Sequence, residues 1–560
     1  MKDFKIGLAT GGKYLAALVF ALSFNFQFLF AQVFRIEKVE YEISGQTQEK
    51  FLRNEVLIDT KKVFSSKEDL DSYISDCKTR LLNLRIFSDV NIEVSENLPQ
   101  PLQLDYLTST FGKNGTSNNS ASNNGMLSAI TASDFVPDSN SADSIDSAEI
   151  IPICLKIRAE DSKHFLLLPY PKYSSNDGAV LKLKMRDDNF RGTITRFEGE
   201  VFGGISDFSS LTPENFNAGF ALNFNYPIFY KSFWIFANTD SSVKFTFDSP
   251  LPSYDINAGL SFVFPLEKNN LRQLVLDFSQ VFVRGDEEHA LFGNDLFYSE
   301  YAKISLPIKM DFADSTLAPY TDFFYCWSDR ELNFDDSEIS SPLAKAGLSF
   351  DFGRVDWLGN FRQGITADFD GGLGFDFIKN DIVPYFSAQV KAFKAWEKFG
   401  IASQLNFFQD ENTRPIGTFL RGIRDTPEIS SKNLADRFLY VPAALCLNLD
   451  FPFHLFSVRP KETSRIKDFG FEVQLAPFVD LALTKNSMTE RFFSPKDGWY
   501  SGGFEVLVYP EKWKSIVVRA SLGLDFGNLI FSKIPGSTYD TSWRSNLSAY
   551  EIFIGIGWQY

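Results

Sequence analysis

Long runs of alternating residues recur through the C-terminal part of the chain, and they constrain its fold more than any other feature. In residues 216–226 every second position carries an aromatic or aliphatic side chain, with Asn, Gly or Ala between. Similar runs occupy residues 254–264, 439–451, 471–483 and 516–526. This period is typical of a β-strand with one apolar face. Each run has about 10 residues, the length that a tilted strand needs to cross a membrane. The pattern therefore predicts membrane-crossing strands.

Strands in a membrane have to form a closed sheet, because lipid offers no partner to an unpaired backbone N–H or C=O. Residues 163–560 provide room for about 16 strands with their loops. The 60 Phe and 20 Tyr residues suit the aromatic girdles of such a wall. We therefore predict a mainly β fold, with a transmembrane antiparallel β-barrel of about 16 strands at 163–560.

The N-terminus has the pattern of a secretory signal peptide. Lys2, Lys5 and Lys13 precede an apolar run at residues 14–30, and Ala31 stands before the polar chain. A basic segment, an apolar segment and a small residue in this order direct export and are then removed. Residues 1–31 are predicted to be this signal.

Residues 32–162 are predicted to form a small α+β domain with the order strand–helix–helix–strand–strand. Residues 33–43 alternate, and Gly45 follows in a turn. Ser65 with Glu68, or Ser66 with Asp69, opens a second helix whose apolar residues share one stripe. Residues 87–94 and 150–157 read as the remaining strands. The segment 97–148 between them is rich in Ser, Asn, Asp and Gly, which predicts a disordered insertion.

Charge and composition argue against several functions. The net charge of −16 disfavours nucleic acid, whose phosphates attract basic surfaces. The three His and four Cys residues are scattered, with no spacing typical of metal ligands and no catalytic grouping. We expect a protein that is not an enzyme, with no cofactor and no metal.

The last residues form one more alternating strand. Its apolar face is expected to consist of Tyr550, Ile552, Ile554, Ile556, Trp558 and Tyr560. A soluble protein seldom ends on an unprotected apolar strand edge. The strand is therefore expected to complete the barrel.

An Arg-Gly pair, Arg421-Gly422, stands in a polar, Pro-containing stretch before the alternating run at 439–451. After that run comes Phe478-Val479-Asp480, and then further alternating runs to the end. This order resembles the C-terminal half of the BamA/TamA-type superfamily (the bacterial surface antigen family), and the 32–162 domain resembles its POTRA module. Leu420, Ile423 and Ala482 depart from the family motifs.

The resemblance implies that Arg421 and Gly422 belong to a loop folded into the barrel, and that Phe478 and Asp480 are its wall partners. Alternation independently turns Asp480 away from Val479 and Leu481 and toward the interior. A carboxylate there needs a cation, and Arg can bind it through two hydrogen bonds. We hypothesise that Arg421 and Asp480 lock the loop inside the barrel. Alternatively, Asp480 is one more polar residue that lines the interior.

The resemblance also implies a function in the cell outer membrane, with the N-terminal domain in the periplasm. The expected function is that of an assembly or insertion factor, which handles unfolded β-barrel or secreted polypeptides through the POTRA-like domain and a lateral seam. The resemblance places this seam between the first barrel strand and the last strand, residues 550–560. Its partners would be outer-membrane lipid, these polypeptides and periplasmic accessory proteins. A two-partner-type polypeptide translocator, and a passive porin or surface antigen, are the alternatives.

Overall fold

The fold is taken from a computed structural model of the full chain. It describes residues 33–96 and 150–556, apart from positions 57, 61, 175–177, 206–211, 231, 248–250, 267–271, 285–295, 311, 313, 329–340, 424–439, 461–469, 487–488, 514–515 and 542–549. The predicted signal peptide at 1–31 and the predicted insertion at 97–148 lie outside the described residues.

The N-terminal region is a four-stranded sheet with two helices. Its strands are in the order β2-β1-β4-β3. The elements are β1 (Val33–Ser44), α2 (Glu49–Glu55), β2 (Val63–Phe64), α3 (Lys67–Asn83), β3 (Phe87–Glu96) and β4 (Ile150–Asp161). The predicted order lacked β2, a two-residue strand between the helices that pairs with β1 at Phe34–Phe64. At the start of α3 the Ser66 hydroxyl accepts a hydrogen bond from the Asp69 N–H, so the helix opens at the later of the two predicted positions.

The chain divides into two compact units. The described residues of the first unit are 33–40, 59–75, 92–96 and 150–156, and those of the second are 41–58, 76–91 and 157–556. This division does not follow the expected boundary between 162 and 163, so the expected domains (1–31, 32–162 and 163–560) stay predictions.

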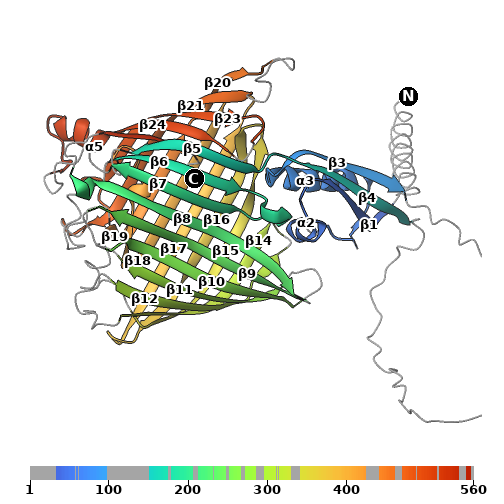
Figure 1. The fold of residues 1–560 in the computed structure, drawn as a ribbon, viewed down its shortest axis with the longest axis horizontal. Coiled ribbons are helices and arrows are strands. Elements are labelled where there is room, and N and C mark those ends of the chain that lie inside the picture. The colour runs from blue at the N-terminus through green and yellow to red at the C-terminus, as the bar shows by residue number, and fades with distance from the viewer. Residues whose placement is uncertain are drawn as a thin grey trace, which may run out of the picture. The chain divides into compact units, whose positions relative to one another are not determined.

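The second unit contains a closed antiparallel barrel whose strands run obliquely across Figure 1. Its strands are β5 (Phe165–Ser174), β6 (Gly178–Asp187), β7 (Phe197–Ile205), β8 (Phe216–Tyr230), β9 (Phe233–Thr246), β10 (Ser253–Pro265), β11 (Gln273–Arg284), β12 (Leu296–Ser305), β13 (Ile308–Met310), β14 (Ser315–Trp327), β15 (Leu343–Leu358), β16 (Phe361–Asp376), β17 (Asp381–Ala395), β18 (Gly400–Pro415), β19 (Tyr440–Asp450), β20 (Phe453–Val458), β21 (Phe471–Asn486), β22 (Arg491–Phe492), β23 (Trp499–Pro510), β24 (Val518–Asp525) and β25 (Tyr550–Ile556). Short helical segments are η2 (Phe190–Gly192), η3 (Pro213–Asn215), η4 (Gly417–Phe419), α5 (Phe526–Leu529) and η7 (Phe531–Lys533).

Eighteen strands make up the wall among the described residues. Of the 21 labelled strands, β13 and β20 continue β12 and β19 after an interruption, and β22 is a short extension beside β21. The expected number was about 16. The wall fits slightly more strands because some connections are very short: only residues 231–232 separate β8 from β9, and only 359–360 separate β15 from β16.

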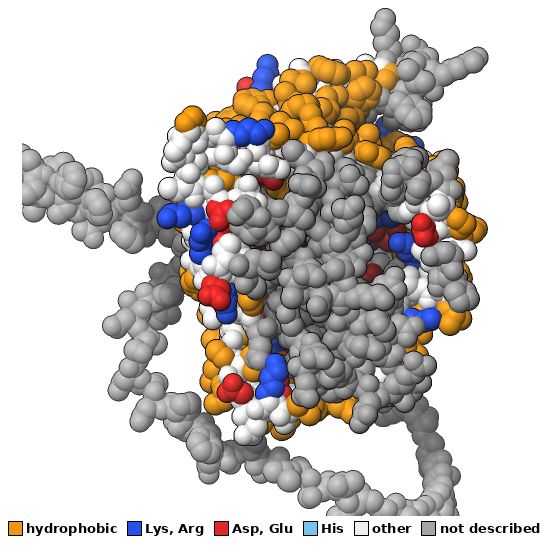
Figure 2. All heavy atoms as spheres, turned by 90° about the vertical axis from the view of Figure 1, so that its left-hand side faces the viewer, with side chains coloured by type: hydrophobic (Ala, Val, Ile, Leu, Met, Phe, Trp, Pro, Cys, Tyr) orange, Lys and Arg blue, Asp and Glu red, His pale blue; other side chains and the backbone are white. Residues whose placement is uncertain are grey.

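The two faces of the wall differ in chemistry as the alternation predicts. Large hydrophobic side chains are exposed on the outside, among them Leu181, Val201, Phe220, Ile365 and Val479. Figure 2 looks at one end of the barrel and shows hydrophobic side chains along its outer edge, densest at its top. The interior carries ion pairs instead, for example Lys184 with Glu198 at 2.8 Å. This is the arrangement of a wall whose outside is in contact with an apolar environment.

In the described part of the chain, the helices are all too short or too polar to span a bilayer.

Candidate functional site

Residues 416–423 form a compact loop inside the second unit, between β18 and β19. Its turn, η4, is closed by hydrogen bonds from Phe419 N–H to the Ile416 carbonyl (2.9 Å) and from Leu420 N–H to the Gly417 carbonyl (3.2 Å). Ile416, Leu420 and Ile423 are fully buried. They share a hydrophobic cluster with residues of the wall, which are Phe408, Val441, Ala444, Cys446, Ala482 and Trp499. The loop is therefore held against the wall by an apolar patch.

Arg421 stands between two buried carboxylates. Its Nε and Nη2 donate to the two oxygens of Asp480 at 3.0 and 2.7 Å, and Nη2 also donates to Asp450 at 2.7 Å. Its guanidinium carbon lies 3.7 Å from the centre of the Phe478 ring. The structure thus brings together Arg421, Phe478 and Asp480, the three residues that the sequence singled out in this order.

Asp480 is fully buried and is surrounded by donors. Besides the guanidinium, it accepts hydrogen bonds from the Arg421 backbone N–H (3.0 Å) and from Asn448 Nδ2 (2.8 Å). Asn448 Nδ2 also donates to the carbonyl of Phe419 in the loop (2.7 Å). A buried carboxylate is stable only when such donors replace water. Asp480 is therefore a specific partner of the loop rather than a generic polar residue of the interior.

Gly422 makes the closest approach between loop and wall. Its φ is +95°, and a Cβ built on it would lie 2.5 Å from the Leu524 backbone N of β24. A Cβ on Gly523 would in turn lie 2.5 Å from the backbone N of Gly422. The Gly422 N–H donates to the Glu551 carboxylate on β25 (3.0 Å). A side chain at either glycine would push the loop off these two strands.

Several wall residues in contact with Arg421 and Gly422 lie in one row of the sheet, whereas Asp480 lies two residues further along β21. Pairing between neighbouring strands aligns Asp450, Phe478, Gly503, Gly523 and Glu551 from β19 to β25. Arg421 occupies the start of this row, and Gly422 occupies its end. The loop therefore bridges five strands of the wall from the inside.

The C-terminal strand β25 presents Tyr550, Ile552 and Ile554 to the outside, where all three are exposed. Ile556 pairs with Val518 on β24, whereas Trp558 and Tyr560 lie outside the described residues. On its other side β25 meets β5, the first barrel strand, and the pairs among the described residues are Phe553–Ser174 and Ile554–Tyr173. This junction is referred to below as the seam.

Sequence reasoning missed several participants in the site. Asp450 and Asn448 were seen only as polar positions of an alternating run, and Glu551 as a residue on the less apolar face of the last strand. Their position on the interior face was therefore readable from alternation. The row that Asp450 shares with Glu551 was not, because it depends on the register of five strands.

Among the described residues, no group of three or more His, Cys, Asp or Glu side chains is placed to hold a metal ion. Cys77, Cys154, Cys326 and Cys446 are all buried, and these four thiols form no disulfide.

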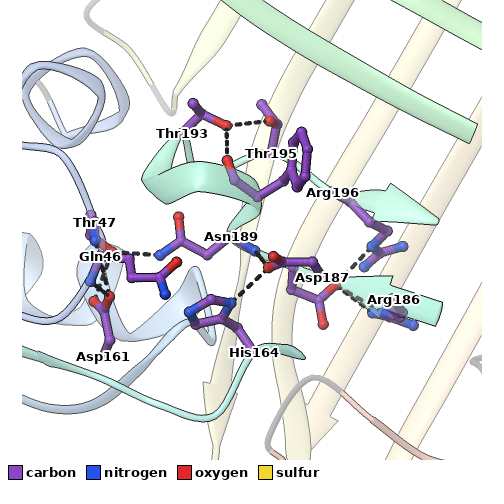
Figure 3. A network of polar contacts seen from close by, with 12 residues as sticks. Gln46, Thr47, Asp161, His164, Arg186, Asp187, Asn189, Thr193, Thr195 and Arg196 are labelled. Atoms are coloured by element: carbon purple, nitrogen blue, oxygen red, sulfur yellow. Dashed lines mark hydrogen bonds and ion pairs between the residues drawn. The ribbon is translucent and has the colours of Figure 1, made fainter. Parts of the chain in front are cut away.

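A second polar network of the same unit joins residues 46–47, 161–164 and 186–196 (Figure 3). The Asp161 carboxylate accepts hydrogen bonds from the backbone N–H groups of Gln46 (2.6 Å) and Thr47 (3.0 Å) and from the Thr47 hydroxyl (2.7 Å). Asn189 Nδ2 donates to the same hydroxyl at 2.7 Å. Gly45 lies directly against Asp161, and a Cβ there would be 2.3 Å from the carboxylate carbon. The network therefore fixes the turn after β1 to the end of β4.

Replacing Asp161 with alanine is expected to release this turn. Three hydrogen bonds to a charged acceptor would be lost, and each contributes about 1.5–3 kcal/mol when buried. Because these groups are only partly buried, we expect hydrogen exchange at the Gln46 and Thr47 amides to become about tenfold faster. The matched control is Glu160→Ala, since the Glu160 side chain is exposed. Unchanged exchange in the Asp161 variant would show that the network does not hold the turn.

The closed wall, its hydrophobic outside and the loop bound within it define the class: a large antiparallel β-barrel with an internal loop. Among solved structures, the chain is similar to BamA from Haemophilus ducreyi lacking POTRA domains 1–3, at 12% identity and a TM-score of 0.40, over 94% of this chain and 85% of that one. It is also similar to CdiB from Acinetobacter baumannii (10% identity, TM-score 0.41, 94% and 74% covered) and CdiB from Escherichia coli (10%, 0.41, 93% and 76%). No family model and no curated protein matches the sequence.

Proposed function

We propose that this chain is an outer-membrane assembly or insertion factor, which handles unfolded β-barrel or secreted polypeptides through its POTRA-like domain and its seam. The observation that carries the proposal is the uneven pairing of β25. Within the described residues 550–556, β25 forms seven residue pairs with β24 on one side and two with β5 on the other. By contrast, β5 forms ten pairs with its next neighbour, β6.

Among the described residues, the pairing of β25 with β5 ends at Ile554. Gly555 and Ile556 belong to the described part of β25, yet neither is paired with β5. An unpaired strand edge is a template on which another extended chain can add a strand. A client polypeptide could therefore bind β5 or β25 by backbone hydrogen bonds and leave sideways into the lipid. Such a step needs no catalytic group and no cofactor.

The exposed hydrophobic side chains of the outer wall suit contact with outer-membrane lipid. The N-terminal domain would then lie in the periplasm, where unfolded polypeptides and accessory proteins are its expected partners. The bound loop favours this function over that of a passive porin or surface antigen, since residues 416–423 occupy the interior that solutes would cross. A two-partner-type translocator would use the same loop and seam.

The test is depletion of the protein in its own cells, followed by rescue with variants and quantification of outer-membrane proteins. Tyr173→Cys with Ile554→Cys would place a disulfide across the seam, because these residues are paired. Leu522→Cys with Ile552→Cys, a pair on β24 and β25, is the matched control. We expect the control to rescue under oxidising conditions and the seam-locked variant to rescue only after reduction.

The pattern of loss separates the candidates. A general fall in outer-membrane proteins is the result that the proposal expects. Loss of a single secreted protein would instead indicate a translocator. Altered solute flux with normal levels of outer-membrane proteins would instead indicate a porin. Full rescue by the oxidised seam variant would show that the seam does not open during function.

A further inference from the structure

The loop and the seam are connected through one side chain, Glu551. This residue lies on β25, between the outward-facing Tyr550 and Ile552, and its carboxylate points to the interior. There it accepts the Gly422 N–H at 3.0 Å. Phe553 and Ile554, which lie two and three residues further along the strand, form the two described pairs of the seam. The contact to the loop is therefore made two residues away from the seam pairs.

The loop itself is anchored elsewhere. Arg421 binds Asp450 on β19 and Asp480 on β21, and both carboxylates are buried. Strands β19 and β21 are joined to their neighbours by continuous pairing of seven or more residues. They thus form a firm part of the wall. The loop reaches from this firm part, across Gly523, to β25, whose other edge forms two pairs with β5 among the described residues.

We propose that Glu551 is a positioning residue that latches the seam strand to the loop and so holds the seam closed. When β25 moves away from β5, its interior face has to move or twist relative to β24 and the loop. The Gly422–Glu551 hydrogen bond then lengthens, because Gly422 is held by the adjacent Arg421. The bond is specific to the closed seam and favours that state over the open one.

In this proposal Arg421 and Gly422 have different roles. Arg421 holds the loop to the firm strands, and Gly422 brings the backbone close enough for its N–H to reach Glu551. Coupling between two equilibria is reciprocal, so release of Arg421 should loosen the seam, and closing the seam should hold the loop more firmly. This inference rests on the proposed function, in which the seam opens, and names the residue that regulates it.

The experiment measures hydrogen exchange of the full-length protein in lipid, at the backbone amides of residues 173–174 and 553–554. Glu551→Ala removes the acceptor and should raise exchange at the seam about tenfold. Glu551→Gln keeps an oxygen that can accept the hydrogen bond from the Gly422 N–H, so it should raise exchange at the seam less. Arg421→Ala should raise it as Glu551→Ala does. The matched control is Glu198→Ala, an interior carboxylate that pairs with Lys184 away from the loop.

Exchange along the β15–β16 ladder, which has 16 residue pairs, reports whether each variant is folded. If Glu551→Ala fails to fold, hydrogen exchange at the seam is compared between Glu551→Gln and the unchanged protein, and a rise in Glu551→Gln supports the latch. Unchanged exchange in folded Glu551 variants overturns the latch, as does an equal rise in Glu198→Ala. No client is present, so the latch can fail while the proposed function stands, and the depletion experiment can fail while the latch stands.

Discussion

Replacing Arg421 with alanine is expected to lower the free energy of unfolding of the barrel by about 3–5 kcal/mol. The change leaves Asp480 and Asp450 buried side by side without the cation that both of them bind. An uncompensated buried charge costs far more than the ion pair itself contributes, which is why removal of one partner is so damaging. Denaturant unfolding in detergent micelles, followed by the loss of heat-resistant migration on a gel, measures the change.

Two variants show whether the effect comes from the buried charges. Arg459→Ala removes an arginine that also pairs with a carboxylate, Glu511, at 2.8 Å, but here both side chains are exposed. An exposed pair contributes at most about 1 kcal/mol, so this control should change little. Combining Arg421→Ala with Asp480→Asn removes one of the buried charges left without Arg421. The double variant should therefore recover part of the lost free energy of unfolding. Equal effects of Arg421→Ala and Arg459→Ala would contradict the role of burial.

The pairing of Arg421 with Asp480 was predictable because alternation is a local signal and because the order of the motifs resembles that of the BamA/TamA-type superfamily. Alternation along β21 fixes the side of the wall on which each residue lies: Val479 is exposed and Asp480 is buried. A carboxylate that faces a barrel interior has to find a donor, and the order of the motifs pointed to Arg421. The barrel class was predictable for the same reason, since each strand carries its own period-two signal.

Register and close approach were not predictable from the sequence. That Gly523 and Glu551 stand in one row with Asp450 depends on the hydrogen-bond pairing of strands that are far apart along the chain. A shift of one strand by a single residue would turn Glu551 to the outside. The Gly422–Gly523 contact depends in addition on the height of the loop above the sheet, which no residue pattern encodes. The short strand β2 was missed because two residues carry no periodicity.

The apolar contacts of the loop are as important as its charges, and Trp499 tests them. This side chain lies fully buried on β23, in the cluster that contains Leu420 and Ile423 of the loop. Trp499→Ala is expected to cost about 3–5 kcal/mol of unfolding free energy, because the large cavity beneath the loop cannot collapse on a rigid wall. Trp499→Phe should cost less, since most of the ring volume is kept. The control is Trp396→Ala, since Trp396 is exposed in the turn between β17 and β18, and a change of about 0.5 kcal/mol or less is expected there.

Combining Trp499→Ala with Arg421→Ala separates the two ways in which the loop is held. If either change alone already frees the loop from the wall, the second has less to remove, and the double variant should lose clearly less than the sum of the single losses. Protease cleavage within residues 416–423 would then rise in both single variants and little further in the double one. Fully additive losses, with the loop still protected in each single variant, would mean that the cluster and the ion pairs stabilise the wall independently and that the loop is not held as one unit.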